Sequence, residues 1–254
     1  MSMEYSGSGD PTRTMALLWG TQKKPSRGPK PSLSVEQIVR TAIELADTDG
    51  VAALSMRRLA DGLGVSTMSL YTYVPSKAEL IDVMLDAVLG EAVGTYEGAW
   101  GWTEKLEVVA RENWALYHRH PWMLHVAAMS RPPLGPHMIA KYDYELRALE
   151  GIGLTDIEMD SVLTLVLGYV QGAARTSVES SQAERSTGIS DYEWWSANAP
   201  LLEEVFDSAR YPIAARVGLV AGETYEAAHD PGYAFEFGLR CVLDGIHSLV
   251  RSRT

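Results

Sequence analysis

Cysteine is almost missing from this sequence, since Cys241 is the only one among 254 residues. A single thiol excludes an intramolecular disulfide. Three histidines lie within residues 118–125, but Pro121 breaks the helix between them and no H-E-x-x-H pairing exists, which argues against zinc. The chain also lacks a G-x-S-x-G elbow, a phosphate-binding glycine loop and a dinucleotide fingerprint. We therefore expect no enzyme, no metal and no cofactor.

Long apolar runs are also absent. No stretch reaches the eighteen uninterrupted apolar residues that predict a membrane span, and residues 1–15 lack the apolar core of a signal peptide. Apolar residues make up 46% and charged residues 22% of the chain, as in an ordinary globular protein. We expect a cytoplasmic protein of one or two domains.

Charge is distributed unevenly along the chain. The net charge is -11 overall, but residues 11–77 carry +4 and residues 78–254 carry -13. A basic front can approach a phosphate backbone when the acidic remainder faces away. The asymmetry is compatible with nucleic-acid binding by the front of the chain.

Residues 1–33 are rich in Gly, Pro and Ser and contain one short apolar patch, Met15–Trp19. The prolines among the basic residues exclude a long helix there. We interpret residues 1–33 as a flexible basic extension that either contacts DNA or stays a solvated tail. Its basic residues are Lys23, Lys24, Arg27 and Lys30.

A helical pattern begins at Ser34, which has capping-box spacing to Gln37. The first helix ends near Gly50. A short helix, Met56 to about Gly62, then precedes a turn, and Ser66 opens a third helix that runs to about Tyr73. A short helix, a glycine-containing turn and a second short helix are typical of the helix-turn-helix.

In that motif the second helix lies in the major groove and contacts base edges. Its outward residues here are Thr67, Met68, Ser69, Tyr71, Thr72 and Tyr73. Arg57 and Lys77, on the flanking helices, suit phosphate oxygens. On spacing alone, a solvated helical hairpin within a bundle is the alternative.

The rest of the chain predicts further helices and no strands. The expected helices are 103–120, 122–129, 136–150, 156–181, 191–206 and 231–251. Residues 162–174 are apolar nearly all round, which predicts burial on more than one face. This segment and the apolar stripe of the last helix suit either a dimer interface or an ordinary core.

The ordered motif resembles the DNA-binding domain of the tetracycline-repressor (TetR) family. The matching residues are Ile38, Ala42, Gly50, Ser55-Met56-Arg57-Arg58-Leu59-Ala60, Leu63-Gly64-Val65, Leu70-Tyr71, Tyr73-Val74, Ser76-Lys77 and Leu80. One subgroup is also resembled by Arg119-His120-Pro121-Trp122, Arg131-Pro132-Pro133-Leu134-Gly135-Pro136, Gly168-Tyr169-Val170, Glu193-Trp194-Trp195 and Phe235-Glu236-Phe237-Gly238-Leu239.

This resemblance implies an all-α homodimer. A three-helix helix-turn-helix head, residues 34–80, would join a larger helical ligand-binding and dimerisation domain, residues 81–254. It also implies a repressor that a small molecule releases from a palindromic operator. The alternative is a constitutive or partner-controlled DNA-binding protein without an inducer.

Aromatic and polar side chains among apolar helices are the candidate ligand contacts, because ligand pockets combine these two kinds of lining. They are Trp114, His118, Trp122, Tyr144, Gln171 and Arg175. Aromatic residues at helical spacing also suit an ordinary core. The effector is expected to be small and largely apolar, and the acidic body favours a neutral or cationic one.

Overall fold

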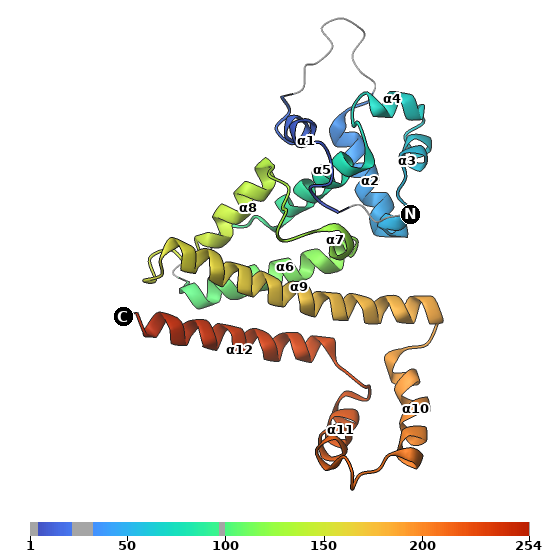
Figure 1. The fold of residues 1–254 in the computed structure, drawn as a ribbon, viewed down its shortest axis with the longest axis vertical. Helices are drawn as coiled ribbons and strands as arrows, with labels where there is room; N and C mark the ends of the chain where they lie inside the picture. The colour runs from blue at the N-terminus through green and yellow to red at the C-terminus, as the bar shows by residue number, and fades with distance from the viewer. Residues whose placement is uncertain (1–4, 22–32, 97–99, 254) are drawn as a thin grey trace, which may run out of the picture.

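The computed structural model describes residues 5–21, 33–96 and 100–253, and this part of the chain is helical without strands. The N-terminal helix is α1 (Pro11–Leu18), and the head contains α2 (Val35–Asp49), η1 (Val51–Ala53), α3 (Met56–Gly62), α4 (Thr67–Tyr71) and α5 (Lys77–Leu89). The body contains η2 (Gly90–Ala92), α6 (Trp102–Arg119), α7 (Met123–Val126), α8 (Pro136–Leu146), α9 (Asp156–Thr187), α10 (Asp191–Val205), α11 (Pro212–Tyr225) and α12 (Pro231–Arg251). The predicted all-α fold is confirmed (Figure 1).

Local capping explains where the head helices begin. The Ser34 hydroxyl accepts the Gln37 amide at 3.2 Å, and the Gln37 side chain accepts the Ser34 amide at 2.9 Å. This is the predicted capping box. Side-chain oxygens of Ser55 and Ser66 cap α3 and α4 in the same way. The three helices then share a core whose fully buried members include Ile38, Ala42, Leu59 and Leu70.

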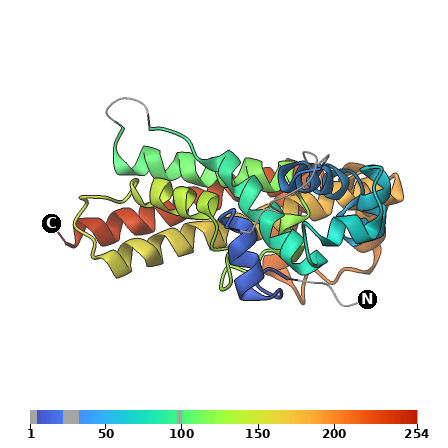
Figure 2. The same cartoon turned by 90° about the horizontal axis from the view of Figure 1, so that it is seen from above.

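The body is built on three long helices, α6, α9 and α12, which run side by side (Figure 2). Phe235, Leu239 and Ile246 of α12 are buried in the core that α12 forms with α6 and α9. The apolar stripe of the last helix is therefore a core within one chain. No residue of α10 or α11 is buried, and both helices lie away from the rest of the body (Figure 1).

Helix α5 connects the two parts of the molecule. It begins at Lys77 in the head, after its N-cap Ser76, and its buried residues include Leu80 in the head core and Val88 next to the body. The expected boundary at residue 80 falls inside this helix, so α5 belongs to both parts.

The expected flexible extension over residues 1–33 is wrong for residues 5–21. Asp10 caps α1 by accepting the Arg13 amide at 2.9 Å, and Pro11 occupies the first turn, where a missing N–H costs nothing. Leu17 and Leu18 are buried, and α1 packs against α5. The basic residues Lys23, Lys24, Arg27 and Lys30 lie outside the described residues.

Other boundaries differ from the sequence prediction. The helix expected at 122–129 covers only Met123–Val126, because Ala127 takes an extended conformation. Helix α9 continues past residue 181 to Thr187 and ends at Gly188 in the left-handed region. No helix was expected at α11, whose Gly218 and Gly222 favour a loop. None of the helices described is long and apolar enough to cross a bilayer.

Candidate functional site

The predicted DNA-reading residues lie on α4 and its surroundings, at the end of the head farthest from α12 (Figure 1). The turn before α4 uses Gly64 at φ +67°, a conformation that glycine adopts without strain. Met68 is 75% exposed and Tyr71 is 41% exposed. Ser69 and Thr72 are also exposed, and Thr67 is half-buried. Five predicted contacts therefore lie where a major groove could reach them.

The remaining predicted DNA contacts differ in exposure and in their partners. They are Arg57, Tyr73 and Lys77. Arg57 is exposed and has no ion-pair partner among the described residues, whereas neighbouring Arg58 pairs with Asp49 at 2.5 Å. Tyr73 is half-buried against the head core. Lys77 is half-buried, and its ammonium donates to the Val51 carbonyl at 3.4 Å. Arg57 is thus the least engaged cation of the motif.

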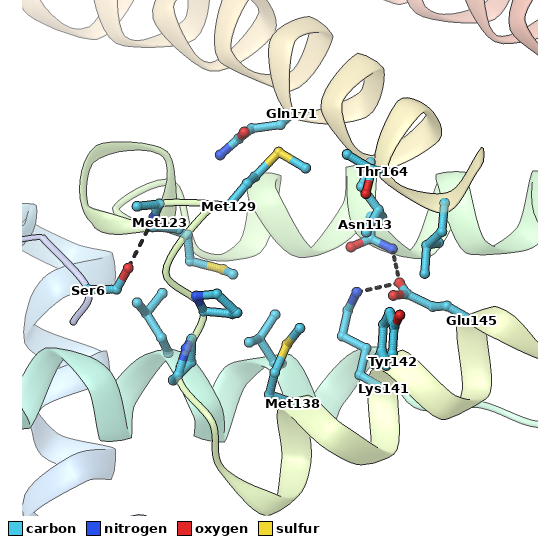
Figure 3. Close-up of a pocket in the computed structure, with 18 of the residues that line it drawn as sticks. Ser6, Asn113, Met123, Met129, Met138, Lys141, Tyr142, Glu145, Thr164 and Gln171 are labelled. Carbon is cyan, nitrogen blue, oxygen red and sulfur yellow. Dashed lines mark hydrogen bonds and ion pairs between the residues drawn. The ribbon is translucent and has the colours of Figure 1, made fainter. Parts of the chain in front are cut away.

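A cavity of about 390 Å³ lies in the body, within the range of small-molecule sites. Helices α5, α6, α7, α8 and α9 and the segment 127–134 line it, and one side is open to solvent (Figure 3). Its apolar lining comprises Leu85, Leu89, Met123, Ala127, Ala128, Met129, Pro132, Pro133, Leu134, Met138, Ile139, Leu163 and Leu167. The three methionines add adaptable surface to this lining.

A buried charged pair closes one end of the cavity (Figure 3). Lys141 and Glu145, one helical turn apart on α8, form an ion pair and are 3% and 1% exposed. The Asn113 amide donates to Glu145 at 2.7 Å and to the Val109 carbonyl at 2.8 Å. Each charge therefore has a partner, as burial requires.

Three other polar groups line the cavity without a hydrogen-bond partner in the described part of the chain. They belong to Tyr117 on α6 and to Thr164 and Gln171 on α9. Burial raises the pKa of Tyr117 to about 12, and the charge of Glu145 adds to the effect. The phenol therefore stays protonated at neutral pH and can donate a hydrogen bond. All three groups are available to a bound molecule.

Of the six predicted ligand residues, only Gln171 lines this cavity. Trp122 is 2% exposed beneath the head, where its indole N–H donates to Asp47 at 2.8 Å. Arg175 donates to the Leu124 carbonyl at 2.5 Å. Both side chains hold elements together, so their assignment as cavity residues is corrected.

The other three candidates do not line the cavity. The Trp114 ring stacks on Phe235 at 4.0 Å between centroids, and Tyr144 stacks on Tyr96 at 4.7 Å. These two residues pack in the body core, which was the alternative open at the level of sequence. His118 is exposed and contacts the Ser177 hydroxyl at 2.9 Å.

Helix α5 holds another wall of the cavity through Asp86. One Asp86 oxygen accepts the Met138 amide at 2.9 Å, and the other contacts the His137 ring nitrogen at 3.0 Å. Asp86 thereby caps the first turn of α8, whose own N-cap, Gly135, has no side chain. Since Leu85 and Leu89 also line the cavity, α5 both forms and positions its walls.

The head and the body also contact each other around His120, a residue that is 4% exposed. Its two ring nitrogens contact Asp47 at 2.8 Å and Glu91 at 3.2 Å, and Arg119 pairs with Glu91 at 2.6 Å. Burial opposes ionisation of Glu91, yet hydrogen bonds from Arg119 and His120 hold its pKa below the ordinary value. The junction is therefore charged and closely packed.

A helix-turn-helix head joined by one helix to a body with a ligand-sized cavity defines a class of DNA-binding regulators. The family model described as "Bacterial regulatory proteins, tetR family" matches residues 38–84. The model described as "Tetracyclin repressor-like, C-terminal domain" matches residues 96–250. The chain belongs to the tetracycline-repressor family of transcriptional regulators, which confirms the resemblance in the sequence.

Individual relatives agree with this assignment. The chain is 46% identical over 253 residues to the HTH-type transcriptional repressor DrrR1 of Streptomyces coeruleorubidus, covering 99% of this chain and 91% of the relative. It is 35% identical over 171 residues to an HTH-type transcriptional regulator of Saccharopolyspora erythraea, covering 67% and 72%. The crystal structure of Streptomyces coelicolor ActR in complex with actinorhodin superposes with a TM-score of 0.70 at 25% identity, covering 85% of this chain and 96% of ActR.

Proposed function

We propose that this chain is a dimeric repressor that leaves its operator when a small, largely apolar molecule occupies the cavity. One observation carries the proposal. Helix α5 begins at Lys77 beside the DNA-reading helix and forms the cavity wall with Leu85 and Leu89. A ligand that prefers one position of α5 shifts the population of head arrangements by its differential affinity.

Two relatives support this function. DrrR1, which matches nearly the whole chain, is named as a repressor. ActR, which has the same fold, was crystallised with actinorhodin. A cavity of about 390 Å³ in this chain suits a small molecule as well.

The cavity chemistry narrows the class of effector. Lys141 and Glu145 balance each other, while Asp160 adds a further carboxylate that accepts the Tyr142 hydroxyl at 2.8 Å. Because these three side chains together carry a net negative charge, an anionic effector is disfavoured. Thr164 and Gln171 present hydrogen-bonding groups from one helix. The proposed effector is a neutral or cationic molecule with an apolar body and hydrogen-bonding groups along one edge.

The outer face of α9 supports a dimer. Leu165 is 54% exposed, and a Cβ added at Gly168 or Gly172 would meet no atom within 4 Å. Small residues of this kind let another helix approach closely. On α12, Phe237 is 53% exposed and Cys241 is exposed. A second copy packed on these two faces would cover them and set two heads on a palindromic operator.

Helices α10 and α11 add apolar surface to this proposal. Exposed positions on them include Leu201, Val205, Ile213 and Val220, at 59–79% exposure. Contiguous exposed apolar surface marks a protein interaction site. We assign this surface to the same dimer, in which each projecting α10–α11 pair contacts the other subunit.

The effector proposal is tested by gel shift on DNA from the promoter beside the gene, with a screen of neutral and cationic polycyclic compounds. Gln171→Leu and Thr164→Val should weaken release by any active compound about tenfold each, because each removes one hydrogen bond to it. Gln182→Leu, on α9 but outside the cavity lining, is the matched control. Compounds that bind the protein without altering operator affinity would favour the constitutive regulator.

The dimer is tested separately through Cys241, the only cysteine and an exposed one. The proposed second copy covers this thiol, so Cys241 should react with a thiol reagent more slowly at high protein concentration than after dilution. Analytical ultracentrifugation of the unlabelled protein gives the mass under the same conditions. A monomeric mass with a thiol that reacts equally fast at all concentrations would contradict the dimer.

A further inference from the structure

The N-terminal segment, residues 5–19, reaches the cavity through Ser6, which is 1% exposed and lines it (Figure 3). The Ser6 amide donates to the Val126 carbonyl at 2.9 Å. The Ser6 hydroxyl donates to the Arg131 carbonyl at 2.9 Å and accepts the Ala128 amide at 3.1 Å. Segment 126–134 forms one wall of the cavity. Ser6 therefore links Val126, at the start of this segment, to Arg131 in its middle.

The same segment is fixed to α5 by two buried carboxylates. Asp82, 1% exposed, accepts the Gly7 amide at 2.9 Å. Glu79, 3% exposed, accepts the Asp10 amide at 3.2 Å. Loss of these donors would leave two buried carboxylates with fewer partners, which is costly. The N-terminal segment is thus held to the helix that carries the head.

Helix α1 completes the attachment. Leu17 and Leu18 are buried as α1 packs on α5, and the Trp19 indole donates to the Leu134 carbonyl at 2.9 Å. Leu134 itself lines the cavity. Residues 5–19 therefore contact the cavity wall at both of its ends and α5 between them.

We infer that the N-terminal segment is part of the effector site: Ser6 shapes the 126–134 wall, and Gly7 and Asp10 connect that wall to α5. This inference rests on the proposed function, since it names a route by which the cavity acts on the head. A bound molecule contacts the 126–134 wall, which Ser6 holds in place. The segment that contains Ser6 is hydrogen-bonded to α5 through Gly7 and Asp10. In the sequence, residues 5–19 lie far from most of the residues that line the cavity.

The backbone at Gly7 is specific to glycine, which provides a sharp test. Gly7 lies at φ +71°, and a Cβ there would meet the Arg131 Cβ at 3.3 Å. Proline at this position cannot take a positive φ and has no N–H to give Asp82. Gly7→Pro therefore removes the hydrogen bond to Asp82 of α5, while Ser6→Ala removes only the two hydroxyl hydrogen bonds to the wall.

The experiment uses full-length protein and Nile red, a neutral planar dye whose fluorescence rises in apolar surroundings. Ser6→Ala and Gly7→Pro should each bind the dye about tenfold more weakly than the parent, the effect of losing an anchoring hydrogen bond. Ser8→Ala, which removes an exposed hydroxyl bonded to Tyr5, should behave as the parent.

Hydrogen exchange gives the coupling readout. Dye binding should slow amide exchange in residues 79–82 of α5, which do not line the cavity, in the parent and in Ser8→Ala, but not in Gly7→Pro. Parent-like dye affinity and parent-like α5 protection in both Ser6→Ala and Gly7→Pro would overturn the inference. Dye binding that never alters operator affinity would contradict the proposed function instead, and the comparison of variants would still decide the role of the segment.

Discussion

Trp122 donates its indole N–H to Asp47 at 2.8 Å, and this bond crosses from the body to the head. Trp122 is almost fully buried, and His120 contacts the same Asp47 oxygen at 2.8 Å. A tryptophan that the sequence favoured as a ligand contact thus holds the head in a defined orientation. If an effector moves the head, that motion must either break the Trp122–Asp47 hydrogen bond or rotate the head about it.

The Trp122–Asp47 bond should contribute measurably to stability. In a double-mutant cycle, Trp122→Phe and Asp47→Ala should show a coupling of about 1.5–3 kcal/mol, the value for a hydrogen bond to a charged group. Urea unfolding at fixed protein concentration measures it. Trp114→Phe combined with Asp47→Ala is the control and should be additive. Additivity of Trp122→Phe with Asp47→Ala would refute the assignment.

A second prediction concerns pH and Asp82. Burial raises the pKa of Asp82 above its ordinary 3.8, the Gly7 hydrogen bond works against this, and the charge of Glu79 adds to it. The folded protein therefore holds the proton more tightly than the unfolded chain. This contribution to stability is complete below pH 3.8 and is lost as pH rises through the raised pKa.

Asp82→Asn has no carboxyl to ionise and keeps an oxygen for the Gly7 amide. The melting temperature of the variant minus that of the parent should therefore become more positive as pH rises from about 3.5 to 7. Thermal unfolding followed by circular dichroism across this range measures the difference. Asp61→Asn, at an exposed position of α3, is the control. A difference that stays constant or falls as pH rises would show that burial does not raise the pKa of Asp82.

Local sequence signals predicted the helices that begin with strong caps. The predicted box of Ser34 and Gln37 forms in the structure, the helices expected from residues 156 and 191 also begin with capping boxes, and helix 231–251 has the predicted bounds. Such signals act over three or four residues, so a single sequence contains them in full. The helix-turn-helix belongs to this category, because its turn and caps are local too.

The cavity could not be predicted in this way, because distant segments build it. Lys141 and Glu145 have the spacing of a solvated surface pair on a helix, and only packing against α6 and α9 buries them. Ser6 lines the cavity and bonds to the Arg131 carbonyl, 125 residues away in the sequence. The aromatic residues were a misleading guide, since the core uses Trp114 and Tyr144 for stacking.

The helix-turn-helix assignment predicts a specific salt dependence. If Arg57 contacts a phosphate, Arg57→Ala should weaken binding on all sequences and lower the slope of log affinity against log salt by about 0.9. Fluorescence anisotropy on promoter DNA between about 50 and 200 mM salt measures the slope. Arg147→Ala removes an exposed arginine at the C-cap of α8 in the body and is the matched control. Equal slopes for the two variants would exclude Arg57 from the interface.

The last prediction separates the buried pair of the cavity from a surface pair on the same helix. Lys141→Met should cost about 3–5 kcal/mol of unfolding free energy, because Glu145 remains buried with its charge uncompensated. Adding Glu145→Gln should recover at least about 2 kcal/mol, since the amide keeps an acceptor for Asn113 without a charge. Arg147→Met breaks the exposed pair between Asp143 of α8 and Arg147 at the C-cap of this helix, four residues apart, and should cost less than about 0.5 kcal/mol. Urea unfolding of all three variants at one protein concentration makes the comparison, because a dimer's stability depends on concentration. If the single and double variants are equally unstable, loss of packing rather than unpaired charge explains the cost, and the charge balance proposed for the cavity is wrong.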